Sequence, residues 1–380
     1  MKISRPVSFV STFLLLSSLL GSASSANAAV NPNCNAIDGD YIVSFAPGVN
    51  IDNEISKVPG RAISPKFKYS SVLNGFAASL TAAQVCAFQK RPNIENIELD
   101  GVVTIDATQS PTPSWGLDRI DQIALNSDIT YNYRSDGAGV TAYVIDTGIQ
   151  TNHPDFGGKA SVGSDFVKDG RNGQDCNGHG THVAGTIGGI NYGVAKKANL
   201  VAVRVLNCRG SGTTTGVIAG IDWVAKNNKN SKAVANLSLG GGISTSLDSA
   251  INNLISKGVI VVVAAGNSAA DACNSSPARV PNAITVAAST NNDNLASFSN
   301  RGACIDIIAP GESITSDWIK SGINTISGTS MASPHVAGGV ARYLSTNLSA
   351  AQLLNDAVIN VIKLVPTGTA NKFLYLNPTN

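Results

Sequence analysis

Continuous runs of apolar, often β-branched residues recur through the C-terminal part of the chain, and each is bounded by polar or glycine-containing segments. Runs without polar alternation are typical of strands that are buried on both faces. The runs that predict such strands are Val140–Ile145, Leu200–Val205, Val234–Leu239, Val259–Ala265, Ile284–Ala288 and Ile305–Ala309.

Helical periodicity separates several of these runs. Apolar residues recur at helical spacing in two segments, and the second segment ends at Gly258. The residues concerned are Val217, Ile221 and Val224, and then Leu247, Ala250, Ile251 and Leu254. Alternating strands and helices predict an α/β fold, a mostly parallel sheet with helices on both faces. Active sites in such sheets gather at the carboxyl ends of the strands.

A different pattern precedes this region. Residues 40–105 predict a strand at Tyr41–Phe45, a short helix, two strands around Asn74-Gly75, a helix and a last strand. The second helix begins with a capping box made by Thr81 and Gln84. These elements indicate a separate, small α+β unit.

A polar segment with two prolines, Thr108–Ser114, follows this unit. Its composition is typical of an exposed linker, so we expect the domain boundary there.

The N-terminus has the features of a signal peptide over residues 1–28. Lys2 and Arg5 precede the apolar run Val7–Leu20, and small residues follow, ending in Ala26-Asn27-Ala28. No later stretch reaches the roughly 20 apolar residues that a spanning helix needs. The sequence therefore predicts a secreted, soluble, extracellular protein with no membrane partner.

Composition excludes some partners and changes the interpretation of the cysteines. The net charge is +2 and the 27 basic residues are scattered, so we expect no nucleic-acid partner. Export to an oxidising compartment favours disulfides for the six cysteines over zinc sites. Four of them lie in the C-terminal part, where three pairings are possible, and Cys34 and Cys86 lie in the N-terminal unit.

Three segments carry residues suited to nucleophilic catalysis. Asp146 ends the first apolar run, His179 stands where a helix opens, and Ser330 lies at a helix start. A serine hydroxyl is a weak nucleophile until an imidazole takes its proton, and the imidazole needs a carboxylate to fix its tautomer. A helix N-terminus also favours developing negative charge.

Each of these residues has a simpler interpretation when taken alone. A lone aspartate at a strand end is usually a cap or turn former, and a lone serine at a helix start is usually an N-cap. His179 and His182 have the spacing of a metal pair, but no third ligand follows on the helix. We expect His182 and His335 to be structural and His153 to be a loop residue.

The three segments, in the order Asp, His, Ser, resemble the signature of the subtilisin superfamily. Further matches resemble the proteinase K branch, and the cysteine placement is most similar to aqualysin-like secreted bacterial proteases. These matches are Trp115-Gly-Leu-Asp-Arg-Ile, Asn236-Leu-Ser-Leu-Gly-Gly-Gly and Ala264-Ala-Gly-Asn267. The resemblance implies a ferredoxin-like propeptide over residues 29–106, which inhibits the enzyme and assists its folding. A peptidase domain over residues 107–380 follows, released by self-processing.

The resemblance also implies roles for individual residues. Ser330 is the nucleophile, His179 the general base and then acid, Asp146 the orienting carboxylate, and Asn267 an oxyanion donor. Two edge segments bind the protein or peptide substrate as an added strand. They are Gly210, Ser211 and Gly212, and Ser238, Leu239 and Gly240. Uncharged Ala264, Ala265 and Gly266 form the specificity pocket and predict a preference for large apolar or aromatic residues.

Structural calcium is a further implication, with no cofactor needed for catalysis. Hard oxygen ligands in loops suit this ion. The ligands implied are Pro281, Ala283 and Asp306 for one site and Asp118, Asp121 and Asp128 for a second, with a third around Asp165 and Asp169. Gly170 stands where the third site would have an acid.

The aqualysin-like pattern pairs Cys176 with Cys208 and Cys273 with Cys304. Cys34 and Cys86 are then left as a pair. The competing interpretation is a buried free thiol at Cys86 and a loose Cys34. We expect the mature protein to be a monomer.

Two other functional classes were weighed against a peptidase. An ester hydrolase of the α/β-hydrolase type needs a Gly-x-Ser-x-Gly elbow and the order Ser, acid, His. Here Ala332 fills the last place and the serine comes last. A catalytically silent binding module on the same scaffold is the remaining alternative, because a fold alone does not guarantee activity.

Overall fold

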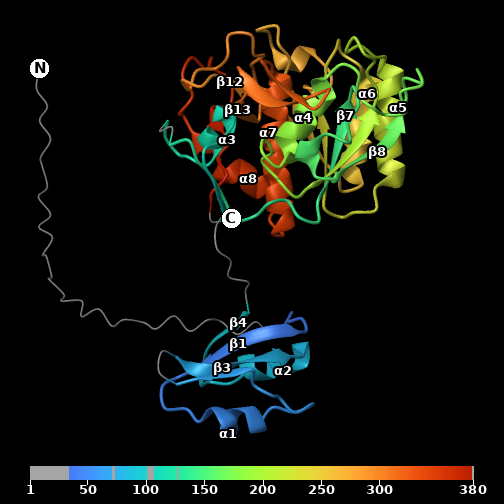
Figure 1. Ribbon diagram of the computed structural model, residues 1–380. Helices are drawn as coiled ribbons and strands as arrows, with labels where there is room; N and C mark the ends of the chain where they lie inside the picture. Colours follow the sequence, from blue (N-terminus) through green and yellow to red (C-terminus); the bar gives the residue numbers. More distant parts are fainter. Residues whose placement is uncertain (1–33, 71–72, 101–106, 126–127, 379–380) are drawn as a thin grey trace, which may run out of the picture. The chain divides into compact units, whose positions relative to one another are not determined.

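The computed structural model describes residues 34–70, 73–100, 107–125 and 128–378. These residues form two compact units, one within residues 1–103 and one within residues 104–380 (Figure 1). The expected signal peptide lies outside the described residues.

The smaller unit is an antiparallel sheet of four strands in the order β2-β3-β1-β4, with two helices. Its elements are β1 (Gly39–Phe45), α1 (Ile51–Ser56), β2 (Phe67–Tyr69), β3 (Asn74–Leu80), α2 (Ala82–Gln89) and β4 (Ile94–Leu99). This βαββαβ order with the last strand beside the first confirms the ferredoxin-like fold.

Local features of the smaller unit agree with the sequence in most respects. Thr81 and Gln84 form the expected capping box of α2. Asn74 and Gly75 do not form a turn between strands: they pair with β1 at the start of β3. An added Cβ at Gly75 would lie 2.3 Å from the Val43 carbonyl oxygen, so the close approach of the two strands requires glycine there.

The larger unit is built on a nine-stranded sheet in the order β16-β17-β13-β12-β11-β10-β7-β9-β8. From β13 to β8 the neighbouring strands are parallel. The bounds are β7 (Thr141–Asp146), β8 (Ala160–Asp165), β9 (Asn199–Arg204), β10 (Ala233–Leu237), β11 (Ile260–Ala264), β12 (Ile284–Ser289), β13 (Ile307–Pro310), β16 (Val358–Ile359) and β17 (Lys372–Phe373).

Helices cover both faces of this sheet, as expected. Ala142 and Val144 of β7 belong to the core shared with α4 (His179–Gly188) and α7 (Thr329–Ser345). The alternate residues Tyr143 and Ile145 belong to a second core, shared with α5 (Thr214–Asn227) and α6 (Thr245–Ser256) (Figure 1). Residues 142–145 of the strand are therefore all apolar, because both of its faces are buried.

Shorter elements complete the unit. A hairpin of β14 and β15 packs against α4. The bounds are α3 (Trp115–Ile120), the 3-10 turns η1 (Pro154–Phe156) and η2 (Ala272–Asn274), β14 (Ile314–Trp318), β15 (Gly322–Ile326) and α8 (Ala350–Asp356).

Thr108, Ser110 and Pro111 are exposed, as expected, but the segment Thr108–Ser114 is not a linker between the two units. β5 (Ala107–Gln109) pairs with β6 (Tyr131–Tyr133), and Ser114 is buried at the start of α3. Backbone hydrogen bonds to β6 hold a segment whose composition alone is typical of a loop. The segment belongs to the larger unit.

The structure contains three disulfides, Cys34–Cys86, Cys176–Cys208 and Cys273–Cys304, as expected. Across the described ranges, no helix has the length and apolar character required to cross a bilayer.

Candidate active site

Asp146 is the last residue of β7 and is completely buried. Its Oδ1 atom lies 2.8 Å from His179 Nδ1 and accepts a 2.7 Å hydrogen bond from the Thr147 N–H. The Asp146 carboxylate thus lies at the carboxyl edge of the parallel sheet. There it contacts Nδ1 of His179 and fixes the tautomer of that ring.

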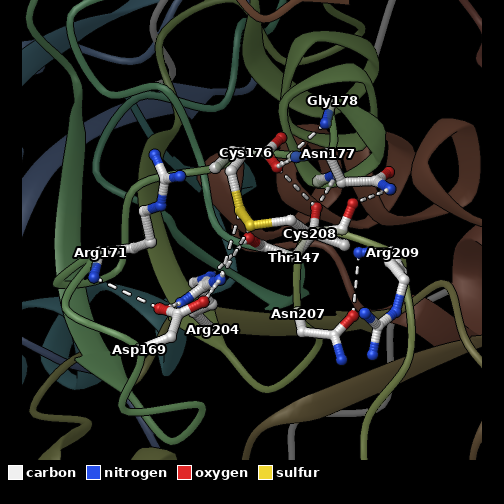
Figure 2. Close-up of a disulfide and its surroundings, with 12 residues drawn as sticks. Thr147, Asp169, Arg171, Cys176, Asn177, Gly178, Arg204, Asn207, Cys208 and Arg209 are labelled. Carbon is white, nitrogen blue, oxygen red and sulfur yellow. Dashed lines mark hydrogen bonds and ion pairs between the residues drawn. A yellow bond between two sulfur atoms is a disulfide. The ribbon is translucent and has the colours of Figure 1, made fainter.

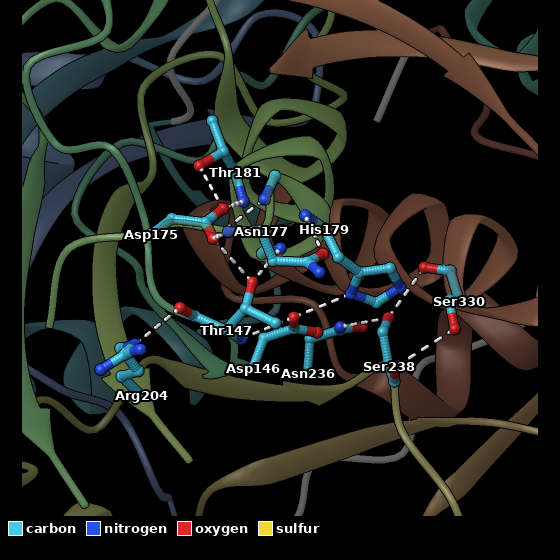
Figure 3. Close-up of polar contacts among 12 residues, drawn as sticks. Asp146, Thr147, Asp175, Asn177, His179, Thr181, Arg204, Asn236, Ser238 and Ser330 are labelled. Atoms are coloured by element: carbon cyan, nitrogen blue, oxygen red, sulfur yellow. Dashed lines mark hydrogen bonds and ion pairs between the residues drawn. The ribbon is translucent and has the colours of Figure 1, made fainter. Parts of the chain in front are cut away.

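His179 is the first residue of α4, and a second carboxylate holds that helix start. Asp175 accepts hydrogen bonds from the backbone N–H groups of Asn177, Gly178 and Thr181 and from the Thr147 and Thr181 hydroxyls (Figure 3). Sequence reasoning missed this role, although an aspartate ahead of a helix is a signal for a cap.

Burial alone would lower the pKa of His179, but the contact with Asp146 and the charge of Asp175 raise it above its ordinary value. The imidazole is therefore a stronger base than a free histidine. A proton taken from a nucleophile would be stabilised on this ring by two carboxylates.

Ser330 is the second residue of α7 and is half-buried. Its Oγ donates a 3.1 Å hydrogen bond to the Ser238 carbonyl oxygen, while the Ser238 hydroxyl donates to the Ser330 carbonyl oxygen over 2.8 Å. Figure 3 shows the His179 ring between Asp146 and Ser330. No hydrogen bond joins His179 to Ser330 in the described part of the chain, and such bonds commonly tighten only when substrate binds.

Asn267 is oriented by the same helix start. Its Oδ1 accepts hydrogen bonds from the Thr329 N–H and hydroxyl, at 2.8 and 2.9 Å. Since the carbonyl oxygen is taken, the amide nitrogen remains as the donor, and Asn267 and Ser330 line the same hollow. This hollow has a volume of about 290 Å³ and has no charged residue in its lining among the described residues.

The hollow is lined by Ala264, Ala265 and Gly266, as expected. A neighbouring groove of about 540 Å³ is lined by His179 and by both expected edge segments, residues 210–212 and residues 238–240. The two spaces share residues 239–241 and Ser276. The structure thus brings together all the residues expected for catalysis and for substrate binding.

The interpretation of Asp165 and Asp169 as calcium ligands is wrong. The buried Arg204 side chain contacts both carboxylates, with Nη1 3.0 Å from Asp165 Oδ2 and 2.6 Å from Asp169 Oδ1. Figure 2 shows Arg204 beside Asp169. The hydrogen bond from Arg204 lowers the pKa of Asp169 to about 2. Arg204 therefore supplies positive charge to both carboxylates, so no calcium ion is needed to compensate them.

Among the described His, Cys, Asp and Glu side chains, the ligand atoms of Asp169, Cys176 and Cys208 lie within 4.8 Å of one another. Because both sulfurs are in a disulfide, this group is not a metal site.

Two histidines are structural, as expected. His182 Nε2 lies 3.0 Å from the Ile314 carbonyl oxygen, and His335 Nδ1 lies 2.8 Å from that of Met331. Burial lowers the pKa of each to about 4, so both rings are neutral. His153 is more than the loop residue expected: it is buried, caps η1 and has Nδ1 3.6 Å from Asp317 Oδ1.

Two of the three acids expected for a second calcium site, Asp118 and Asp128, contact the same backbone N–H group. The Thr130 N–H contacts both Asp118 Oδ1, at 3.2 Å, and Asp128 Oδ1, at 2.9 Å. Asp121 Oδ1 is buried without a hydrogen-bond partner. Burial, with the charges of Asp128 and Asp118, raises the pKa of Asp121 to about 6. A group of carboxylates in which one buried oxygen lacks a hydrogen-bond partner is chemically suited to a divalent cation.

Asp306 lies beside the loop that would supply the carbonyl ligands of the first site. Its Oδ2 accepts a 2.8 Å hydrogen bond from the Thr285 N–H, and its own N–H donates to the Thr285 carbonyl oxygen. Burial raises the pKa of Asp306. Pro281 and Ala283 lie four and two residues before Thr285 in the chain, and backbone carbonyls with a carboxylate are ligands that calcium prefers.

Comparisons with known proteins agree with this geometry. Residues 137–373 match the subtilase family, and residues 40–106 match peptidase inhibitor I9. Alkaline serine exoprotease A of Vibrio alginolyticus is 52% identical over 314 residues, which are 80% of this chain and 58% of that protein. The extracellular serine proteinase of Thermus sp. (strain Rt41A) is 51% identical over 315 residues, 81% of this chain and 76% of that protein.

A solved structure gives the same result. The crystal structure of a cold adapted subtilisin-like serine proteinase is 56% identical, has a TM-score of 0.68, and covers 70% of this chain and 99% of its own. The chain therefore belongs to the subtilase family of serine endopeptidases, with an I9 segment ahead of the peptidase unit.

Proposed function

We propose that this chain is the precursor of a secreted serine endopeptidase in which Asp146, His179 and Ser330 form the catalytic triad. The main support is the 2.8 Å contact between the buried Asp146 carboxylate and His179 Nδ1. The opposite edge of the His179 ring is directed toward Ser330 (Figure 3). A serine protease needs this arrangement because the ring must accept the hydroxyl proton during attack.

The reaction follows from the geometry in two steps. His179 Nε2 takes the Ser330 proton while Oγ attacks the substrate carbonyl carbon, and the same proton then passes to the leaving amine. The developing oxyanion is stabilised by the Asn267 amide and the Ser330 N–H, and water attacking with His179 as base later releases the acid product. Asp146 stabilises the imidazolium throughout.

Substrate binds as an extended strand between residues 210–212 and residues 238–240. Glycines in both segments allow a close approach of two backbones, and strand addition supplies main-chain hydrogen bonds. The side chain before the scissile bond enters the hollow beside Ser330, whose uncharged lining favours apolar residues.

Peptide hydrolysis after different residues tests this specificity. Chromogenic peptides ending in Phe, Tyr or Leu should be cleaved faster than those ending in Lys or Asp, because burying a large apolar side chain contributes about 1.5 to 3 kcal/mol. Faster cleavage after Lys would contradict the assignment of the pocket.

Maturation belongs to the same proposal. Residues 29–106 are the inhibitory propeptide, and residues 107–380 are the monomeric enzyme. The enzyme itself cuts the Asp106–Ala107 bond between them. The agreement of residues 40–106 with peptidase inhibitor I9 supports this division. The extracellular Thermus relative and the apolar N-terminal run support export.

Calcium is proposed as a structural ion. Asp306 with the Pro281 and Ala283 carbonyls would hold one ion, and Asp118, Asp121 and Asp128 a second. The buried unpartnered Asp121 Oδ1 supports the second site. Bound calcium would neutralise these carboxylates and tie together loops of the folded protein.

One variant tests catalysis and maturation together. Purified Ser330→Ala precursor should hydrolyse no peptide and remain uncut, whereas the wild-type precursor should be processed. Processing of the purified variant would show that another protease does the cutting. A fluorophosphonate probe should label wild-type protein at Ser330, and absence of labelling would favour a catalytically silent binding module.

A further inference from the structure

Arg209 is the one Asp, Glu, Lys or Arg side chain among the described residues that line the 540 Å³ groove. It is exposed, and no carboxylate in the described ranges forms an ion pair with it. Peptides lying in this groove would therefore meet a single unpaired positive charge.

The backbone that carries Arg209 is held in a fixed turn. The Asn207 N–H donates to the Ser211 carbonyl oxygen over 2.9 Å, and Asn207 Oδ1 accepts from the N–H groups of Arg209 and Ser211, at 2.9 and 3.2 Å. The neighbouring Cys208 is joined to Cys176 (Figure 2). The guanidinium thus extends from a rigid support.

This turn is also tied to the loop that leads into the catalytic histidine. Asn177 follows Cys176, and its Nδ2 donates a 3.0 Å hydrogen bond to the Cys208 carbonyl oxygen. Asn177 Oδ1 in turn accepts from the His179 N–H over 3.2 Å. The backbone at Arg209 is therefore held in a defined place relative to His179, and both residues line the groove.

Strand geometry indicates which residue of a bound substrate would face Arg209, and this step rests on the proposed function. Successive side chains of an extended peptide point to opposite sides. If the residue before the scissile bond enters the hollow beside Ser330, the second residue on the N-terminal side faces away from it. That direction leads to the groove that His179 and Arg209 both line.

We propose that Arg209 makes the enzyme prefer peptides with an acidic residue at the second position on the N-terminal side of the scissile bond. A guanidinium presents several N–H donors to a carboxylate in matching geometry. Because the pair is exposed, we expect a preference of about threefold, which salt weakens as screening shortens the range of the charge.

Two peptides that differ only by Glu or Gln at this position test the proposal, each with Phe before the scissile bond. The ratio of kcat/KM for the Glu peptide to that for the Gln peptide should be about three at low ionic strength. It should approach one in molar salt. In Arg209→Gln the ratio should be near one at all salt concentrations, and Arg209→Lys should retain part of the preference.

Arg171→Gln is the matched control. Arg171 is an exposed arginine near the same disulfide but outside the lining of the groove, so the ratio should stay at the wild-type value. Equal kcat/KM for the two peptides in wild type, or equal loss of preference in both variants, would overturn the proposal. Absence of hydrolysis of either peptide by wild type would instead contradict the proposed peptidase function.

Discussion

Asp317 in β14 is a completely buried carboxyl to which no donor in the described part of the chain gives a hydrogen bond. The adjacent group is another carboxyl, Asp155, so a shared proton supplies the missing donor. His153 Nδ1 accepts a hydrogen bond from the Asp155 N–H at 3.2 Å, and its 3.6 Å distance from Asp317 Oδ1 is too long for a hydrogen bond. The Lys159 amine donates to two backbone carbonyls. Burial, and then Asp155, raises the pKa of Asp317 to about 8.

This raised pKa predicts a stability that depends on pH. The value of about 8 in the folded protein exceeds the ordinary 3.8, so the contribution of protonated Asp317 is complete below about pH 4. It is lost as pH rises to about 8. Asp317→Asn keeps a donor toward Asp155 at every pH and should raise the melting temperature at pH 9 by several degrees, with less effect at pH 5.

Melting should be measured in a Ser330→Ala background, which avoids self-digestion. Asp222→Asn, which changes an exposed aspartate paired with Lys226, should shift melting little at either pH. The same shift for Asp317→Asn at pH 5 and at pH 9 would contradict the assignment of the proton to this pair.

Substitution of Asn267 tests whether its side-chain amide stabilises the oxyanion. Asn267→Ala should lower kcat by about 100 to 1,000 fold, the loss found when this donor is removed from a subtilisin, with little change in KM. The Ser330 N–H remains, so some activity should persist. A kcat within tenfold of wild type would show that the amide does not contact the oxyanion.

At the scale of elements, prediction from sequence was most accurate where burial is complete. The strands β7, β10, β11 and β12 are apolar on both faces, and each was expected within two residues of its observed bounds. β8 and the hairpin of β14 and β15 were not expected, because their burial is mixed and polar residues interrupt them. These segments become strands because of the strands and helices they contact, which their local sequence pattern does not reveal.

The Cys34–Cys86 disulfide is expected to stabilise the small N-terminal unit. It closes a loop across 52 positions, and such a constraint on the unfolded chain is worth about 4 kcal/mol on the chain-entropy model. In the Ser330→Ala precursor, replacing both cysteines by serine should speed proteolytic cleavage within residues 34–100. The same precursor with intact cysteines, kept reduced, is the matched control and should behave like the double variant. Unchanged cleavage in both would show that packing alone holds the unit.

For the whole molecule, the order of the Asp, His and Ser segments was sufficient to predict that Asp146, His179 and Ser330 lie together. The sequence did not show which basic side chain neutralises a given carboxylate. Asp165 and Asp169 had the appearance of ion ligands until the structure showed Arg204 between them. Arg204 is a β9 residue buried under a loop, and no local pattern connects it with these acids.

Calcium is the last prediction and concerns the stability of the whole peptidase unit. An ion that binds the folded state alone adds stability by mass action, so chelation should lower the melting temperature of the Ser330→Ala protein. Because the pKa of Asp121 is raised to about 6, protons compete with the ion below that pH, and the shift should be larger at pH 8 than at pH 5.

Two variants separate the proposed sites. Asp121→Asn should reduce the melting shift caused by calcium, because it removes a carboxylate whose Oδ1 is buried without a partner. Asp165→Asn is the matched control: it lowers stability through Arg204, but the calcium shift should persist. A full shift in Asp121→Asn that disappears in Asp306→Asn would assign the effect to the Asp306 site alone. No shift on chelation of the parent protein would refute both sites, and the carboxylates around Asp121 would then have to be compensated by protons.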